Sequence, residues 1–296
     1  MIHPSQFFKK TSHHSLIVLC LFMMSGCGDK QAPKKTAADP SSDGSYLQQA
    51  VALDHQGNLD DTLQILNKAI QINPNDAKAY GARGDIYVKK HEFDEAMEDF
   101  NKSITLDSNF AAAYAARGLI ETGVKNQVDQ GLEDFNKAIG LNPNEVKYYQ
   151  YRADIYSNKG DYSDAVGDYS KILELNPALK NIYSLRGLAY LMQNKYTQAL
   201  QDINHAILDN QNVEQNYNNR CFCYDKLGQY DKALVDCNNA IALDASVADT
   251  YDTRAAVYLH KKDYDRSWAD VRRVKALGGK VSSDTLKALK KESNRT

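Results

Sequence analysis

The sequence has no excess of charge of either sign. Its 36 Lys and Arg residues and 38 Asp and Glu residues give a formal net charge of −2. Proteins that bind nucleic acids usually carry a basic patch, and those that bind single strands add interleaved aromatic side chains. Neither pattern occurs in this sequence. We therefore expect no nucleic-acid partner.

The sequence also lacks the common signatures of catalysis and cofactor binding. It contains no Gly-rich phosphate loop, no Gly-x-Ser-x-Gly motif and no histidine pair at the four-residue spacing of a zinc-binding helix. Acidic pairs such as Asp263 and Asp265 are most simply solvated. Four histidines occur at unrelated places, namely His55, His91, His205 and His260. We expect no catalytic residue, no metal site and no cofactor.

A third absence concerns hydrophobic runs, since crossing a bilayer needs about 20 apolar residues. The apolar run over residues 16–24 is too short for this, and it follows Lys9 and Lys10. A basic start followed by a short apolar segment predicts a secretory signal.

The end of that run, Met24-Ser25-Gly26-Cys27, is similar to the lipobox of bacterial lipoproteins. The resemblance implies that residues 1–26 are a signal peptide and that Cys27 is diacylated and anchors the chain to a membrane. A plain signal peptide, or an incidental cysteine, is the alternative. Because Gly28 follows the cysteine and Asp29 comes one place late for retention at the inner membrane, the resemblance favours the periplasmic face of the outer membrane.

The segment after the cysteine predicts a disordered tether. Residues 28–42 are rich in Ala, Pro, Ser, Asp and Lys and show no periodicity. A flexible segment of this length has a root-mean-square reach of about 20 Å. We therefore expect residues 27–42 to hold the remaining chain close to the membrane surface.

Residues 146–179 predict two short helices joined by a turn. From Tyr149, aromatic and small residues recur at spacings of four and three, which places them on one helical face. Gly160 interrupts the pattern and predicts the turn. The second helix is expected to end before Pro177, which cannot donate the next helical hydrogen bond.

This unit recurs with a period of 34 or 35 residues. Each arginine of one set follows a tyrosine by three residues and precedes an aspartate by 16 or 17. The arginines are Arg83, Arg117, Arg152, Arg186, Arg220 and Arg254, and the aspartates are Asp99, Asp134, Asp168, Asp202, Asp236 and Asp270. A fixed period of this size is the signature of a helical solenoid.

The pattern resembles the tetratricopeptide repeat family, which has small residues at repeat positions 8, 20 and 27, aromatics at 4 and 11, and proline at 32. Residues 146–179 match all of these except position 27, where Ile172 is larger. The resemblance implies an all-α, right-handed α–α superhelix of seven helix–turn–helix repeats over residues 43–281. The repeats are expected at residues 43–76, 77–110, 111–145, 146–179, 180–213, 214–247 and 248–281. Residues 282–296 are expected to form a C-terminal capping helix and tail.

The recurring arginines and aspartates favour a structural role over a cationic binding groove. Repeat position 7 lies next to the packed positions 4, 8 and 11, where a lone charge is costly. An aspartate from the second helix of the same or the adjacent repeat would satisfy each arginine through a bidentate pair. We therefore predict that all twelve residues fix the register between helices.

Three cysteines remain after Cys20 leaves with the signal and Cys27 is lipidated. Cys221, Cys223 and Cys237 all lie in the sixth repeat. The interpretation that we favour is three small buried side chains. The alternative is a disulfide from Cys221 or Cys223 to Cys237, which an oxidising periplasm would permit.

The resemblance also indicates where a partner would bind. In the family the first helix of each repeat, helix A, lines a concave groove, and ligands meet positions 2, 5, 9, 12 and 13. At these positions we predict an exposed apolar patch and amides that bond an extended peptide. The patch is Leu188, Leu191, Met192, Phe222 and Leu259, and the amides are Asn181, Asn218 and Gln150. The alternative is that a C-terminal helix containing Leu286 and Leu289 covers the patch.

The function that the resemblance implies is a non-catalytic scaffold, lipid-anchored in the bacterial cell envelope, that holds envelope proteins or peptides in its groove. Lipoproteins of this class assist pilus or secretin assembly or dock cell-wall hydrolases, and the sequence does not choose between these roles. The alternative is a periplasmic receptor for a peptidoglycan fragment or glycan. Such a receptor needs exposed aromatic side chains in the groove, and only Phe222 qualifies.

Overall fold

The computed structural model describes residues 43–293, and this range contains only α-helices and turns. The helices are α3 (Asp43–His55), α4 (Leu59–Ile72), α5 (Ala77–Lys89), α6 (Phe93–Leu106), α7 (Ala111–Gly123), α8 (Val128–Leu141), α9 (Val146–Lys159), α10 (Tyr162–Leu175), α11 (Asn181–Met192), α12 (Tyr196–Asp209), α13 (Glu214–Lys226), α14 (Tyr230–Leu243), α15 (Ala248–His260), α16 (Tyr264–Ala276) and α17 (Ser283–Ser293). The signal peptide predicted over residues 1–26, Cys27 and the tether lie outside the described residues.

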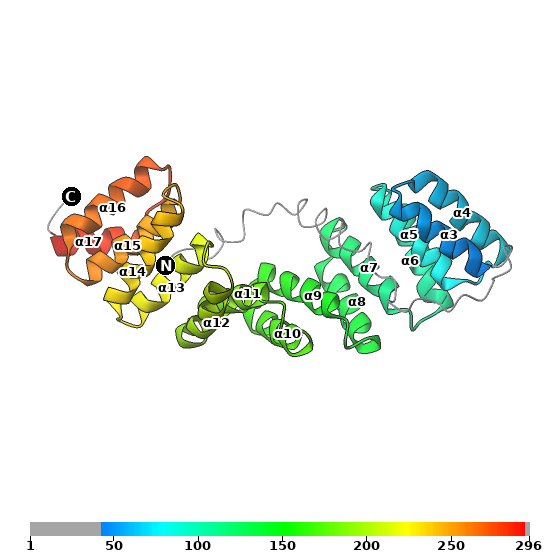
Figure 1. Ribbon diagram of the computed structural model, residues 1–296, viewed down its shortest axis with the longest axis horizontal. Helices are drawn as coiled ribbons and strands as arrows, with labels where there is room; N and C mark the ends of the chain where they lie inside the picture. Colours follow the sequence, from blue (N-terminus) through cyan, green and yellow to red (C-terminus); the bar gives the residue numbers. More distant parts are fainter. Residues whose placement is uncertain (1–42, 294–296) are drawn as a thin grey trace. The chain divides into compact units, whose positions relative to one another are not determined.

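The helices follow one another as hairpins, one for each predicted repeat, and the all-α repeat fold is confirmed. Helix A of a repeat is the odd-numbered helix from α3 to α15, and helix B is the even-numbered helix that follows it. In Figure 1, α3 to α6 (blue to cyan) lie side by side, as do α13 to α17 (yellow to red). Within the described residues, none of these helices is both long and apolar enough to cross a membrane.

The helices belong to two compact units, one up to Ile155 and the other from Tyr156. In the N-terminal unit, helices α5 and α7 contact each other directly. In the C-terminal unit, α13 contacts both α11 and α15, so the three A helices form a continuous layer. We call α11, α13 and α15 the A-helix layer. Helices α12 and α14 each pack against the A helix that follows them, and α17 packs on α15 and α16.

Small residues at repeat position 8 let the two helices of a hairpin approach closely. A Cβ atom at Gly84 would lie only 2.7 Å from the ring of Phe100, which is 1% exposed. At Gly131 a Cβ atom would lie 2.8 Å from the backbone oxygen of Gly118. Helix B buries a residue at position 24 of the repeat, or 25 in the third. These residues are Phe100, Phe135, Tyr169, Ile203, Cys237 and Val271.

A residue in the left-handed backbone region stands in each turn from helix A to helix B. Glycine accepts this conformation without steric cost, and Gly160 supplies it in the turn expected from the sequence, at φ 88°. In the other six turns the residues are Gly57, His91, Asn126, Asn194, Gly228 and Lys262. His91 and Lys262, each at φ 62°, adopt it although a side chain disfavours it.

Candidate functional site

Five of the recurring arginines form bidentate pairs with the aspartates of their own repeat. The Nε and Nη2 atoms of Arg83 donate to Asp99 at 2.8 and 2.7 Å. The same geometry, with N···O distances of 2.6 to 2.8 Å, joins Arg117 to Asp134, Arg186 to Asp202, Arg220 to Asp236 and Arg254 to Asp270. The hydrogen bond to Asp99 raises the pKa of Arg83 above its ordinary value, and the other four arginines show the same effect from their own aspartates.

A second contact of these arginines, which the sequence analysis missed, joins consecutive repeats. Each Nη1 atom donates to a side-chain oxygen sixteen residues earlier, on the helix B before it. The acceptors are Asn67, Asn101, Asn136, Ser170, Asn204 and Asn238. The signal was present in the sequence, because Asn or Ser stands sixteen residues before every arginine of the set. Arg152 donates to Asn136 within the N-terminal unit, while its pairing with Asp168 would join the two units and stays a prediction.

The prediction of an exposed apolar patch is wrong. Leu188 and Leu259 are each 8% exposed, and Leu191 is 9% exposed. Leu191 packs against Ile203 of α12 and Cys223 of α13, because neighbouring A helices use this position to contact each other. The inner positions that carry leucine therefore belong to the core rather than to a binding surface.

The other residues of the predicted patch also pack against neighbouring helices, namely Phe222, Met192 and Leu259. Phe222 and Met192 are partly buried against the same cluster as Leu191. The Phe222 ring meets Tyr196 edge-on, with centroids 6.2 Å apart, and the Lys226 Nζ atom lies 5.0 Å from its centroid. Leu259 is covered by α17, whose Leu289 is 0% exposed. The alternative that a C-terminal helix covers part of the patch thus holds at Leu259.

The three predicted amides differ in their surroundings. Asn181 is exposed at the start of α11, and Gln150 is half-buried on α9 in the N-terminal unit. Asn218 is 4% exposed, and its Oδ1 atom has no hydrogen-bond partner among residues 43–293. Of the three predicted amides, only Asn218 therefore has a buried hydrogen-bond acceptor without a donor among residues 43–293.

Polar contacts tie the A helices to one another. The Oγ atom of Ser184 donates to Oδ1 of Asn216 at 3.2 Å, which joins α11 to α13. Thr250 Oγ1 donates to the Glu214 carboxylate, which joins α13 to α15. In the N-terminal unit, Lys89 Nζ donates to Asp54 at 2.5 and 2.6 Å and joins α5 to α3. A further such contact in the C-terminal unit joins His260 of α15 to Asp225 of α13. Asp252 of α15 accepts instead from the N–H of Ser282, in the segment before α17.

Two carboxyl groups on A helices have raised pKa values, although each has a cation nearby, Lys89 for Asp85 and Arg117 for Glu121. Burial raises the pKa of Asp85 to about 7, against a smaller opposing effect of Lys89. Burial, followed by the neighbouring Asp134 carboxylate, raises the pKa of Glu121 to about 7. Glu121 is 9% exposed, and its Oε2 atom has no hydrogen-bond partner among the described residues.

Cys221 and Cys237 form a disulfide between α13 and α14, with their Cα atoms 5.4 Å apart. Our preferred interpretation of three reduced side chains is therefore wrong for these two. Cys223, two residues later on the helix, points into the cluster with Leu191 and stays a buried thiol whose pKa burial raises to about 12. The bond joins repeat position 8 to position 24.

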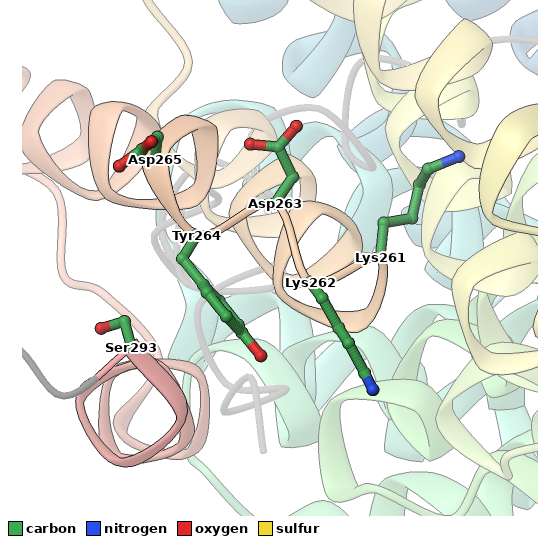
Figure 2. A pocket seen from close by; sticks show the side chains of 6 residues that line it. All are labelled: Lys261, Lys262, Asp263, Tyr264, Asp265 and Ser293. Atoms are coloured by element: carbon green, nitrogen blue, oxygen red, sulfur yellow. The ribbon is translucent and has the colours of Figure 1, made fainter.

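A polar hollow lies between the α15–α16 turn and the end of α17, lined by Lys261, Lys262, Asp263, Tyr264, Asp265 and Ser293. Figure 2 shows that Lys262 and Tyr264 extend to one side of the turn, while Asp263 and Lys261 point to the other. Asp263 also accepts from Arg266, and Lys261 pairs with Asp231. The charged groups do not converge on one point, so this hollow is a poor binding site. Within residues 43–293, no cluster of His, Cys, Asp or Glu is arranged to hold a metal ion.

Comparison with known proteins agrees with the repeat pattern. Models of the tetratricopeptide repeat match residues 45–76, 77–110, 146–179 and 216–246. No curated protein matches the sequence.

Solved structures with a similar fold are repeat proteins. The C-terminal part of a TPR repeat-containing protein from Cytophaga hutchinsonii has 17% identity, with coverage of 82% of this chain and 98% of that chain and a TM-score of 0.62. A tetratricopeptide repeat protein from Parabacteroides merdae ATCC 43184 has 18% identity, coverage of 86% and 99%, and a TM-score of 0.53. YrrB, described as a TPR protein with an unusual peptide-binding site, has 19% identity, coverage of 67% and 99%, and a TM-score of 0.55. At these identities the likeness shows the fold alone.

Proposed function

Because the chain is a tetratricopeptide repeat protein, we propose that it is a non-catalytic scaffold that holds envelope proteins or peptides on its A-helix layer. Proteins of this family are generally scaffolds for protein–protein interaction. YrrB, which shares the fold, is described as having a peptide-binding site. The enzyme alternative has no support in the sequence motifs or in the side-chain clusters of residues 43–293.

The observation that carries this proposal is the set of polar side chains that the A-helix layer leaves exposed. Asn181 and Gln215 lie at the starts of α11 and α13, and Lys226 and His260 lie at the ends of α13 and α15. The B helices pack against the layer, yet leave these four side chains open to solvent. Amide and charged groups of this kind bond an extended main chain and its side chains.

We further propose that the scaffold works in the cell envelope, anchored through Cys27 at the periplasmic face of the outer membrane. The lipobox-like Met24-Ser25-Gly26-Cys27 supports the anchor. The Cys221–Cys237 disulfide supports an oxidising compartment, because such bonds are rare where glutathione and thioredoxin keep thiols reduced. The tether predicted over residues 28–42 would let the layer meet partners close to the membrane.

Site-specific photo-crosslinking tests the binding surface. A photoreactive residue at Gln215, on the A-helix layer, is compared in living cells with one at Val235, which is 60% exposed on helix B. We expect discrete crosslinked adducts from position 215 and none from position 235. Equal crosslinking from both positions, or none from position 215, would contradict the proposal.

Metabolic labelling tests the anchor. An alkyne analogue of palmitate is expected to label the native chain and to leave the Cys27→Ala variant unlabelled and absent from the membrane fraction. A Cys223→Ala variant is the matched control, because it removes a buried thiol instead. Label that survives Cys27→Ala would contradict lipidation at this residue.

A further inference from the structure

Three carboxylates near the starts of α13 and α15 have no Lys, Arg or His partner among the residues that the structure describes. Glu214 is the first residue of α13, and Asp249 and Asp252 lie within the first five residues of α15. Within residues 43–293, none of the three pairs with Lys, Arg or His. The other end of the same helices differs, because Asp225 there binds Nδ1 of His260 at 2.6 Å. Asp225 also lies 3.7 Å from Lys226 Nζ, so within residues 43–293 the carboxylate at this end of α13 has a cation nearby and those at the other end do not.

Two of these carboxylates, Glu214 and Asp252, have raised pKa values. Burial, with a smaller effect of Asp244 and Asp249, raises the pKa of Glu214, although the Thr250 hydroxyl acts in the opposite direction. Burial also raises the pKa of Asp252 to about 6. The N–H of Ser282, at 3.1 Å, does not offset this burial. The ionised forms of both groups thus lack the stabilisation that a nearby cation would give.

The unsatisfied amide of Asn218 lies beside these carboxylates. Asn218 follows Glu214 by one helical turn and so shares its face of α13. The Glu214 side chain reaches Thr250 on α15, which shows that this face is directed at α15. The Oδ1 atom of Asn218 is buried and has no hydrogen-bond donor among residues 43–293. A buried acceptor without a partner is unfavourable and points to a missing donor.

Helix dipoles alone do not explain this arrangement. Acidic residues are favoured in the first turn of a helix, which accounts for Glu214 and Asp249. The effect fades beyond that turn, so it does not account for the buried Asp252. It also does not account for the neutral Asn218. The four groups share a different property, since each offers a hydrogen-bond acceptor and none has a Lys, Arg or His partner among residues 43–293.

We propose that the starts of α13 and α15 bind an arginine or lysine side chain from an extended segment of a partner protein. A guanidinium or ammonium group only donates hydrogen bonds, and it carries the positive charge that the site lacks. Glu214 and Asp249 are half-buried and accessible to such a group. Rotation about the Cβ–Cγ bond of Asn218 brings Oδ1 towards it. This inference rests on the proposed scaffold function and names the chemistry of the partner.

Peptide binding tests the proposal. The probe is a fluorescent Gly/Ser peptide bearing four arginines, and its partner probe has citrulline, which is neutral, at the same four positions. Binding to the purified full chain in non-ionic detergent is followed by fluorescence anisotropy. We expect the arginine peptide to bind about tenfold tighter than the citrulline peptide, with a preference that weakens as salt is added. Equal binding of the two peptides, or no binding of the arginine peptide, would overturn the proposal.

A charge-matched pair of variants locates the site. Glu214→Gln with Asp249→Asn removes two charges from the proposed site, and Glu95→Gln with Glu98→Gln removes two from the exposed face of α6. We expect the first pair alone to abolish the preference for arginine, while thermal melts show that both variants fold. An equal loss in both variants would overturn the proposal, because it would indicate general attraction to the acidic chain. Undiminished crosslinking from Gln215 in the first pair would overturn the arginine site yet leave the scaffold function intact.

Discussion

The Nη1 atom of Arg220 donates a 2.7 Å hydrogen bond to Oδ1 of Asn204, which lies on helix B of the preceding repeat. The other side of the same guanidinium binds Asp236 of its own repeat at 2.6 and 2.7 Å. One side chain therefore fixes both the hairpin and its junction with its neighbour. Repeat arrays are stabilised by these two kinds of contact, within a repeat and between adjacent repeats.

Removing the arginine is expected to cost much more than removing its asparagine partner. Arg220→Ala leaves the Asp236 carboxylate, 2% exposed, without a cation, and such losses cost about 3–5 kcal/mol. Asn204→Ala removes one hydrogen bond and is expected to cost about 1 kcal/mol. Urea unfolding followed by circular dichroism measures both. The double variant Arg220→Leu/Asp236→Leu should recover most of the loss, and equal effects of the two single changes would contradict this account.

Reduction of the disulfide is expected to destabilise the C-terminal unit. The bond spans 16 residues, and closing a loop of this size in the unfolded chain contributes about 3 kcal/mol. Dithiothreitol should therefore lower the melting temperature of the native chain and leave a Cys221→Ala/Cys237→Ala variant unchanged. Cys223→Ala is the control, because that variant keeps the bond and its response to reductant. A native melting curve unaffected by reductant would argue against the bond.

Stability is expected to fall as pH rises from about 4.5 to about 7, because of Glu121. Its ordinary pKa is 4.5, and burial with the nearby Asp134 carboxylate raises it to about 7 in the folded chain. The folded chain thus holds a proton that the unfolded chain releases in this interval, so the stabilisation is present below it and lost above it. Asp85 and Asp252, whose pKa values are raised to about 7 and about 6, act in the same direction.

Glu121→Gln is expected to stabilise the chain at pH 8 and to flatten the pH dependence, because the amide has no charge to bury. Melting temperatures at pH 5 and pH 8 measure the effect. The control is Glu98→Gln, an exposed carboxylate on α6, which should leave the slope unchanged. An unchanged slope in Glu121→Gln would show that other groups produce it.

The C-terminal helix is expected to stabilise the last repeat through one leucine. Leu289 of α17 is 0% exposed and packs against Leu259 and Val271. Leu289→Ala should lower the free energy of unfolding by about 2–5 kcal/mol, as for other buried leucines. Hydrogen exchange should show the loss in α15 and α16 first. Leu208→Ala, at a side chain that is 77% exposed, is the control and should have little effect.

The periodic residues could be interpreted from sequence because a period of 34 residues places them at equivalent points of every hairpin. The pairing of Arg220 with Asp236 followed from two opposite charges that recur in phase. The acceptor Asn204 was equally periodic, and it was missed because an uncharged side chain gives no comparable signal. The repeat period thus predicts where a residue lies in its hairpin. The partner of that residue could be predicted only where the two side chains have opposite charges.

The binding surface was harder to predict, because exposure depends on how adjacent repeats pack. Family positions suggested that Leu188 and Leu191 face a groove. The structure buries both, and Leu191 packs in a cluster that α11 shares with α12 and α13. In the same way Asn218 is notable only because the fold buries its Oδ1 atom without a hydrogen-bond donor among residues 43–293.

The sequence by itself determined the helical repeats and the five Arg–Asp pairs within hairpins, since these depend on residues at a fixed spacing along the chain. Only the tertiary structure decided that Cys221 rather than Cys223 bonds Cys237, and that the inner leucines are core. Both outcomes depend on the direction in which a side chain leaves its helix relative to a neighbouring helix. That direction is set by the packing of whole helices, and no local pattern of residues encodes it.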